Sequence, residues 1–177
     1  MRSIKKANKI IYLIMGLLLI VVVTLVLVNR GDAELRRALE ENRQFQILVE
    51  GNIAVTVSLN DLIDMHPQEF ITVMNTSANA PQEVSLKGVE LRVLLDAFGI
   101  DAPPDASFIV SALDGYVSPL TRSEVYKEEN AYICYSMDGE ILKTWSDGGY
   151  GPFMMVLRSE LFAQRWCKYV ETIDVRR

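Results

Sequence analysis

One apolar run near the start of the chain limits what the rest can fold into. Residues 10–28 are apolar except for Gly16 and Thr24. At a rise of about 1.5 Å per residue, a helix of this length crosses the hydrocarbon core of a bilayer. Four basic residues and no acid precede the run, so the positive-inside rule places residues 1–9 in the cytoplasm. We therefore expect a single-pass transmembrane anchor in the cell membrane, with an extracytoplasmic domain after it.

A cleaved signal peptide is the alternative interpretation, because it too has a basic start and an apolar centre. The run is longer than a usual signal core, and a poor small-residue site at residues 31–33 follows it. No cysteine stands directly after the run, as lipoprotein processing would need. The anchor is the preferred interpretation, and cleavage stays open.

Two cysteines, Cys134 and Cys167, would lie in an oxidising compartment under this topology, so a disulfide is allowed. Both have apolar or aromatic neighbours in the sequence, and buried free thiols are the alternative. The distance between their Cα atoms decides between the two, and the sequence does not give it.

The charge of the chain divides at the apolar run. Five of the 18 Lys and Arg lie in the first 30 residues, where there is no acid. Residues 31–177 therefore carry 13 basic and 23 acidic side chains, a net charge of −10. Because phosphates demand a basic face, we expect no nucleic-acid partner. Anionic headgroups would also repel such a domain, so we expect contact with the membrane through the N-terminal helix.

The remaining patterns predict a stalk and one domain. Residues 29–44 carry opposite charges at helical spacing and predict a solvated stalk helix. Residues 45–177 carry short strand patterns with two or three short helices and no regular alternation between them, which indicates an α+β domain around a mixed β-sheet. We predict strands at 45–49, 53–57, 70–75, 107–112, 131–136, 153–157 and 173–175, helices at 61–65, 91–98 and 121–128, and loops at 76–82 and 145–152.

A glycine-rich loop in the last third of the chain predicts a ligand-binding segment. Residues 147–152 read Asp-Gly-Gly-Tyr-Gly-Pro. Glycines allow a backbone to come close to a flat or anionic group. The predicted contact residues of this loop are Gly149, Tyr150 and Gly151.

Two cations follow this loop. Arg165 and Lys168 are three residues apart, so on a helical turn they would point the same way. A planar guanidinium and a compact ammonium together suit a phosphate. The alternative is that they form ordinary surface ion pairs with Glu160, Glu171 or Asp174.

These segments resemble the end of the molybdopterin-binding domain of the sulfite oxidase family. There, a Gly-Pro and an apolar strand precede an aromatic, an Arg, a Lys three residues later and an Ile-acid-Val strand. From about residue 45 to 175 the likeness also rests on Gly88-Val89-Glu90-Leu91, Gly99-Ile100, Asp114-Gly115-Tyr116 and Met137-Asp138-Gly139. The resemblance implies the fold of that domain. It further implies that Arg165 and Lys168 contact the pterin and its phosphate, and that Asp114 and Tyr116 lie near the cofactor pocket.

The resemblance also implies a metal ligand that this chain lacks. In that family a cysteine after an early strand ligates molybdenum, and the matching residues 71–79 contain none. Neither Met74 nor Asn75 replaces an anionic thiolate. We therefore predict no catalytic residues and a binding function, for a small anionic or heteroaromatic ligand or an envelope protein partner, with molybdopterin a possible cofactor. The alternative is a molybdopterin-dependent oxidoreductase that binds its cofactor without a protein thiolate.

Other chemistries have little support in the sequence. His66 is the single histidine, so a site built on paired histidines is excluded, and we predict no metal site. The chain has no nucleophile elbow, phosphate loop or dinucleotide fingerprint. Five aromatic residues would suit a flat ligand if they surround the glycine-rich loop, and are otherwise core or rim residues: Tyr116, Trp145, Tyr150, Trp166 and Tyr169.

Overall fold

The computed structural model describes the backbone of residues 2–76 and 80–177, with the side chains of 2–13 and 25–32 outside the description. Helix α1 (Arg2–Glu41) runs unbroken over the expected anchor and most of the expected stalk. Among the described residues, no helical stretch is both long and apolar enough to cross a bilayer. The two ends of the expected span, residues 10–13 and 25–28, lie outside the described side chains.

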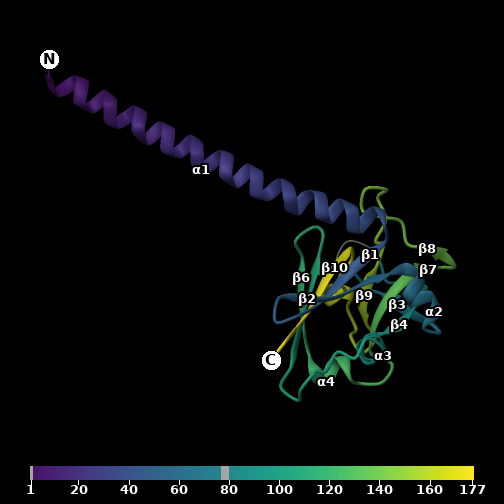
Figure 1. The fold of residues 1–177 in the computed structure, drawn as a ribbon. Helices are drawn as coiled ribbons and strands as arrows, with labels where there is room; N and C mark the ends of the chain where they lie inside the picture. The colour runs from purple at the N-terminus through teal and green to yellow at the C-terminus, as the bar shows by residue number, and fades with distance from the viewer. Residues whose placement is uncertain (1, 77–79) are drawn as a thin grey trace. The chain divides into compact units, whose positions relative to one another are not determined.

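The chain divides into two compact units, Met1–Ala38 and Leu39–Arg177. Two five-stranded sheets build the second unit (Figure 1). In the first sheet, neighbouring strands pair antiparallel except for the two that come from the start and the end of the unit, which pair in parallel, with Ile47 opposite Ile173. The order is β2 (Asn52–Ser58), β1 (Gln44–Val49), β10 (Val170–Arg176), β5 (Ser107–Ala112) and β6 (Val117–Thr121).

The second sheet is antiparallel at each of its described pairings. One of its central strands pairs with three others, so the short last strand lies off the main path. The order is β3 (Gln68–Met74), β4 (Gln82–Glu90), β7 (Ala131–Met137) and β8 (Glu140–Ile141), with β9 (Met154–Leu157) also on β7.

Short helices connect the strands, and local signals in the sequence explain two of them. Helix α2 (Leu59–Asp64) and helix α4 (Arg122–Val125) each begin with a capping box, in which the side chains of the N-cap and the N3 acid satisfy each other's backbone amides. Helix α3 (Leu91–Ala97) buries its apolar face, and η1 (Ala163–Arg165) is one 3₁₀ turn.

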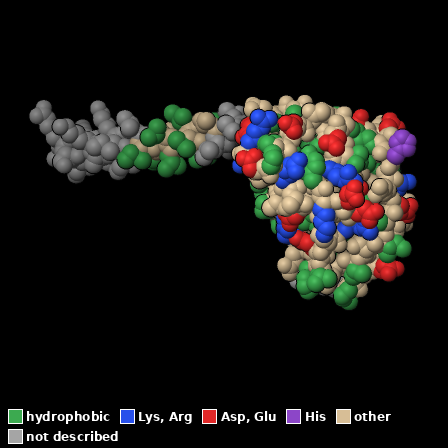
Figure 2. Space-filling model, turned by 90° about the horizontal axis from the view of Figure 1, so that it is seen from below, with side chains coloured by type: hydrophobic (Ala, Val, Ile, Leu, Met, Phe, Trp, Pro, Cys, Tyr) green, Lys and Arg blue, Asp and Glu red, His purple; other side chains and the backbone are tan. Residues whose placement is uncertain are grey.

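The buried apolar side chains of both sheets form one hydrophobic core. Phe45 of β1 and Phe153 before β9 are fully buried, and their rings meet edge to face with centroids 4.9 Å apart. All four residues of β9 are buried, because this strand lies inside the unit. On the face seen in Figure 2, acidic and basic side chains are interspersed over the domain.

The α+β class and the mixed sheet are confirmed, as are most of the predicted elements. Strand β5 has the predicted bounds, 107–112. Three of the described strands were not predicted. In β4, Gln82 was assigned to a polar loop and Gly88-Val89 to the approach to α3, while residues 83–87 had no assignment. Strand β6 contains Pro119, which is tolerated because this strand lies at a sheet edge. The short β8 follows a segment predicted only as a turn.

Candidate functional site

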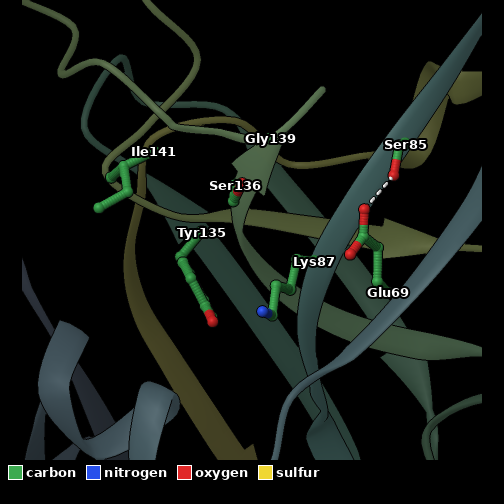
Figure 3. A pocket seen from close by; sticks show the side chains of 7 residues that line it. All are labelled: Glu69, Ser85, Lys87, Tyr135, Ser136, Gly139 and Ile141. Carbon is green, nitrogen blue, oxygen red and sulfur yellow. Dashed lines mark hydrogen bonds between the residues drawn. The ribbon is translucent and has the colours of Figure 1, made fainter.

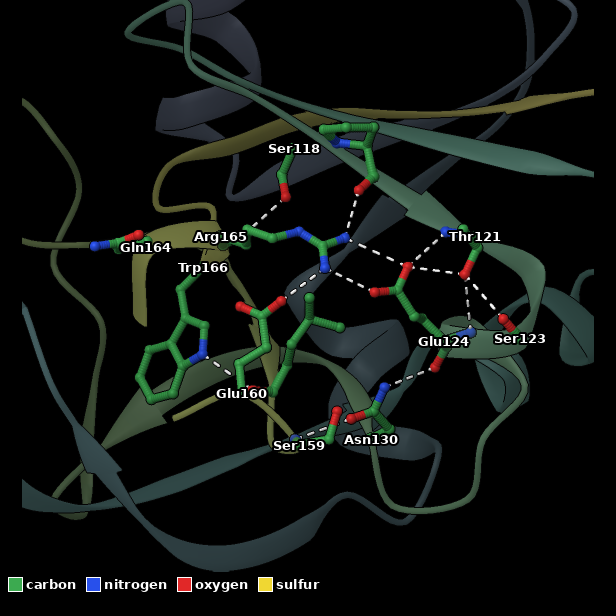
Figure 4. Close-up of polar contacts among 12 residues, drawn as sticks. Ser118, Thr121, Ser123, Glu124, Asn130, Ser159, Glu160, Gln164, Arg165 and Trp166 are labelled. Carbon is green, nitrogen blue, oxygen red and sulfur yellow. Dashed lines mark hydrogen bonds and ion pairs between the residues drawn. The ribbon is translucent and has the colours of Figure 1, made fainter. Parts of the chain in front are cut away.

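Arg165 lies at the end of η1, and acceptors from three segments surround its guanidinium (Figure 4). Its Nη1 donates to Glu124 Oε1 at 2.7 Å and to Glu160 Oε1 at 2.6 Å. Its Nη2 donates to the carbonyl of Pro119 at 2.6 Å. The hydrogen bond from Arg165 holds the pKa of Glu124 at about 2, below its usual value. The charge of Arg165 is therefore balanced within the domain.

The local structure fixes this arrangement from both sides. Thr121 caps α4, and its backbone and hydroxyl both donate to Glu124 Oε2, which orients the carboxylate. The hydroxyl of Ser118 donates to the Arg165 carbonyl at 2.8 Å. Asn130 donates to the carbonyl of Glu124 and accepts from the amide of Ser159, which joins the same two regions again.

Lys168 makes different contacts from Arg165. Its ammonium lies 3.7 Å from the centroid of the Tyr150 ring, in cation–π geometry. The side chain is half-buried, and the loss of hydration lowers the pKa of Lys168. The structure thus brings Lys168 to Tyr150 of the glycine-rich loop, while Arg165 joins an ion-pair cluster with Glu124 and Glu160.

The glycines of the loop pack closely against their own chain. A Cβ on Gly149 would lie 2.3 Å from the carbonyl oxygen of Lys143, and one on Gly151 would lie 2.6 Å from the Leu142 side chain. The amide of Gly149 donates to Thr144, and that of Gly151 to Lys143. These contacts give the two glycines a structural reason that does not involve a ligand.

The Asp-Gly-Tyr segment forms a turn beside η1. Asp114 Oδ1 accepts from the amide of Tyr116 at 3.0 Å, as a side chain does in an Asx turn. The hydroxyl of Tyr116 donates to the carbonyl of Gln164 at 2.7 Å. Asp114 also acts on the charge of Lys168 and favours its protonated form. Asp114, Tyr116 and Lys168 therefore lie in one neighbourhood.

The other predicted aromatic residues divide between surface and core. The ring of Trp145 is half exposed and lies 6.1 Å from that of Tyr169, centroid to centroid. Trp166 is buried, and its indole N–H donates to the carbonyl of Leu157 at 3.2 Å. Trp166 is thus a core residue, as the structural interpretation of this set expected.

A cavity of about 320 Å³ lies beside the glycine-rich loop. Its lining includes Gly149 and Tyr150 of the loop, together with residues from the end of β7, from β8 and from the segment that follows β8. Neither Arg165 nor Lys168 belongs to its lining. The loop therefore borders a cavity, but the two predicted cations do not.

Sequence reasoning missed a second cavity of about 320 Å³, on the sheet of β3, β4, β7 and β8 (Figure 3). Lys87, Tyr135 and Ser136 line it with a charged or hydroxyl group each. A lysine one residue before Gly88, with a Tyr-Ser pair in a strand, is a faint signal in the sequence. The strand that carries Lys87 was itself not predicted as one.

Both cysteines are free and buried in the core. Cys134 lies opposite Met154 in the backbone pairing of β7 with β9. Cys167 lies opposite Met155 in an isolated backbone β-bridge, so the two cysteines lie on either side of β9. Burial raises the pKa of Cys167 to about 12 and that of Cys134 far above its usual range. The alternative of buried free thiols is confirmed, and the disulfide is absent.

The resemblance implies a molybdenum site with a cysteine ligand. A molybdenum–sulfur bond needs a thiolate, and both thiols of this chain are held protonated inside the core. Within the described parts of the chain, no cluster of His, Cys, Asp and Glu could hold a metal ion. These residues do not fit a thiolate-ligated molybdenum.

Comparison with known proteins agrees with the fold. The chain belongs to the family of oxidoreductase molybdopterin binding domains, whose family model matches residues 34–177. The predicted resemblance is thereby confirmed. Among solved structures, the sulfane dehydrogenase SoxCD from Paracoccus pantotrophus is similar, with a TM-score of 0.62 and 16% sequence identity over 77% of this chain and 39% of that chain. This likeness shows the fold alone. No curated protein matches the chain.

Proposed function

We propose that this chain is a membrane-anchored, extracytoplasmic member of the molybdopterin-binding domain family that works as a binding domain and not as a molybdenum oxidoreductase. The observation that carries the proposal is the state of its two thiols. Cys134 and Cys167 are both buried with raised pKa values, so neither supplies a thiolate to a metal at the surface. Residues 71–79, which match the ligand region of the family, contain no cysteine, although residues 77–79 lie outside the described part.

The position of Arg165 supports the same proposal. An arginine that grips a phosphate needs an unbalanced charge, whereas two carboxylates already contact this guanidinium. A third negative group would have to displace Glu124 or Glu160. The ligand of the domain is a small anionic or heteroaromatic molecule, or an envelope protein partner, and it binds elsewhere than at Arg165.

The sequence supports the place of the domain in the cell. The apolar run at residues 10–28, behind a basic N-terminus, makes α1 the anchor and puts residues 1–9 in the cytoplasm. The acidic domain then lies outside, in an aqueous compartment where it meets soluble ligands and other envelope proteins.

Molybdenum analysis tests the catalytic alternative. The full chain is produced in a host that makes molybdopterin and is purified in detergent, beside a family member that has the ligand cysteine. Metal analysis and pterin fluorescence are then measured on both. We expect molybdenum and pterin near one per chain in the cysteine-bearing control and far below that in this protein. One molybdenum and one pterin per chain in this protein would refute the proposal and establish the molybdopterin-dependent oxidoreductase without a protein thiolate.

A further inference from the structure

The cavity on the sheet of β3, β4, β7 and β8 collects three hydrogen-bond donors. Its volume, about 320 Å³, is at the lower end of the range for small-molecule sites. Figure 3 shows the ammonium of Lys87, on β4, and the hydroxyl of Tyr135, on β7, pointing into the same space. Ser136, next to Tyr135, lines the cavity as well. These three groups come from two neighbouring strands.

A β-bulge explains how two consecutive residues of one strand reach one cavity. Lys87 pairs with Ser136 and Gly88 pairs with Cys134, so Tyr135 is the extra residue without a partner on β4. A bulge of this kind re-aims a side chain that regular alternation would send to the opposite face. Gly88 permits the close approach, because a Cβ there would lie 2.4 Å from the carbonyl oxygen of Ile133.

Lys87 has an opposite charge directly across from it and does not pair with it. Glu69 is its cross-strand neighbour on β3, a position that normally favours an ion pair. Glu69 Oε1 instead accepts from the hydroxyl of Ser85 at 2.8 Å. Among the interactions of the described residues, none is a hydrogen bond or ion pair of the Lys87 ammonium. Its charge is therefore left for a ligand.

The two hydroxyl groups are also without a partner in the described part of the chain. Tyr135 and Ser136 are 5% and 7% exposed. No fully buried polar side-chain atom of the described residues lacks a partner, so these two oxygens keep some accessible surface. Loss of hydration raises the pKa of Tyr135, which keeps its hydroxyl protonated and able to donate. Unpartnered donors in a concave site have a free-energy reason to bind an acceptor.

We propose that Lys87, Tyr135 and Ser136 form a binding site for the oxyanion of a small ligand, a carboxylate or a phosphate. The site would be the place where the proposed binding domain binds its anionic ligand, and to that extent it rests on the proposed function. The ammonium supplies the charge, and the two hydroxyls supply directed hydrogen bonds. Glu69 lines the same cavity, and its negative charge disfavours large polyanions. Its carboxylate can also accept a hydrogen bond from a donor group on the ligand.

Binding of simple anions to the full chain in detergent tests this site. Inorganic phosphate is followed by phosphorus NMR line broadening, and acetate by its methyl proton signal, in parallel titrations. We expect saturable binding of at least one of the two anions. Lys87→Met keeps the apolar stem and removes the charge, and should weaken binding at least tenfold, about 1.4 kcal/mol. Lys127→Met makes the same charge change at an exposed position after α4 and should bind as the wild type does.

Further variants separate this site from a general effect of charge. Tyr135→Phe and Ser136→Ala should each weaken binding severalfold, because each removes one donor. Circular dichroism confirms that each variant is folded. If the wild type binds neither anion, or if Lys87→Met binds like Lys127→Met, the site is refuted.

The same preparations keep this proposal apart from the proposed function. Protein that is free of molybdenum but binds neither anion refutes the Lys87 site and leaves the binding-domain proposal standing. Protein that carries molybdenum and binds an anion through Lys87 refutes the binding-domain proposal and leaves the site.

Discussion

At the scale of single residues, Arg165 shows how one side chain can have two interpretations until its partners are known. Its spacing from Lys168 predicted a pair of cations that grip one anion, with surface ion pairs as the alternative. The structure places Glu160 beside it, one of the partners considered, and adds Glu124 from α4, far away in the sequence. Because both acceptors are carboxylates, the domain satisfies the guanidinium without a ligand.

The ion pair with Arg165 makes the stability of the domain depend on pH. Since the folded state lowers the pKa of Glu124 to about 2, its contribution is fully present above the unfolded-state pKa of about 4.3 and is lost as the pH falls toward 2. Because solvent screens this partly exposed ion pair, we expect Glu124→Gln to lower the free energy of unfolding at pH 7 by only about 1 kcal/mol. Urea unfolding of both proteins between pH 7 and pH 2 should show the gap closing below about pH 4.

Glu128→Gln is the matched control for this prediction. Glu128 is an exposed acid on the same segment, four residues further along the chain, so its loss should change stability little. A Glu124→Gln protein as stable as the wild type at pH 7 would show that Arg165 is not held by this carboxylate. That result would return Arg165 to the set of residues free to bind a ligand.

The candidate site could be predicted from the sequence only where its contacts lie inside segments that the sequence itself pointed to. The Asp114 turn and the contact of Tyr150 with Lys168 lie within segments that the sequence had singled out. The partner of Arg165 on α4 could not be predicted, because 41 residues separate it from Glu124. Lys87 could not be linked to Tyr135 either, since their meeting depends on a register shift between strands.

At the scale of elements, residue composition and capping residues correctly predicted several strands and helices. The aromatic and β-branched residues of 107–112 predicted β5, and the cap at Thr121 predicted the start of α4. Strand β4 was missed because only Val84 and Leu86 mark its first part, and its end, with Val89, runs on directly into α3. The bulge in its pairing with β7 is a tertiary feature, which no periodicity shows.

The packing of the glycine-rich loop is likewise a tertiary feature that the sequence did not show. A pair of substitutions tests its structural role. Gly149→Ala places a Cβ against the Lys143 backbone and should lower the free energy of unfolding by about 2–3 kcal/mol. Gly148 has a φ of +73° and open space around it, so Gly148→Asn should cost less than about 1 kcal/mol, because asparagine tolerates this conformation. Thermal and urea unfolding measure both. Equal stability of the two variants would mean that Gly149 does not pack against Lys143 as described.

At the scale of the whole molecule, the first and the last described part of the second unit meet, because they contribute neighbouring strands to one sheet. Strand β1 follows α1, strand β10 lies at the other end of this unit, and the two pair in parallel inside the first sheet. Leu39, at the end of α1, is 4% exposed and belongs to this unit, and Glu40 accepts from the amide of Ser146 at 2.9 Å. The last residues of α1 are therefore part of the domain, and the family model likewise begins at residue 34.

The remaining prediction concerns how the chain is attached to the cell. If residues 10–28 span the bilayer, the full chain should stay with the membrane fraction in high salt and in alkaline carbonate, because burial of apolar side chains does not depend on charge. A chain that begins at Glu34 keeps Leu39 and Glu40 and should be soluble and folded. A peripheral attachment through the domain is disfavoured by its net charge of −10, which anionic headgroups repel.

Protease added outside spheroplasts should digest the domain of the full chain. Release of the full chain by salt or carbonate, or protection of the domain from the protease, would contradict the anchor or its orientation, respectively.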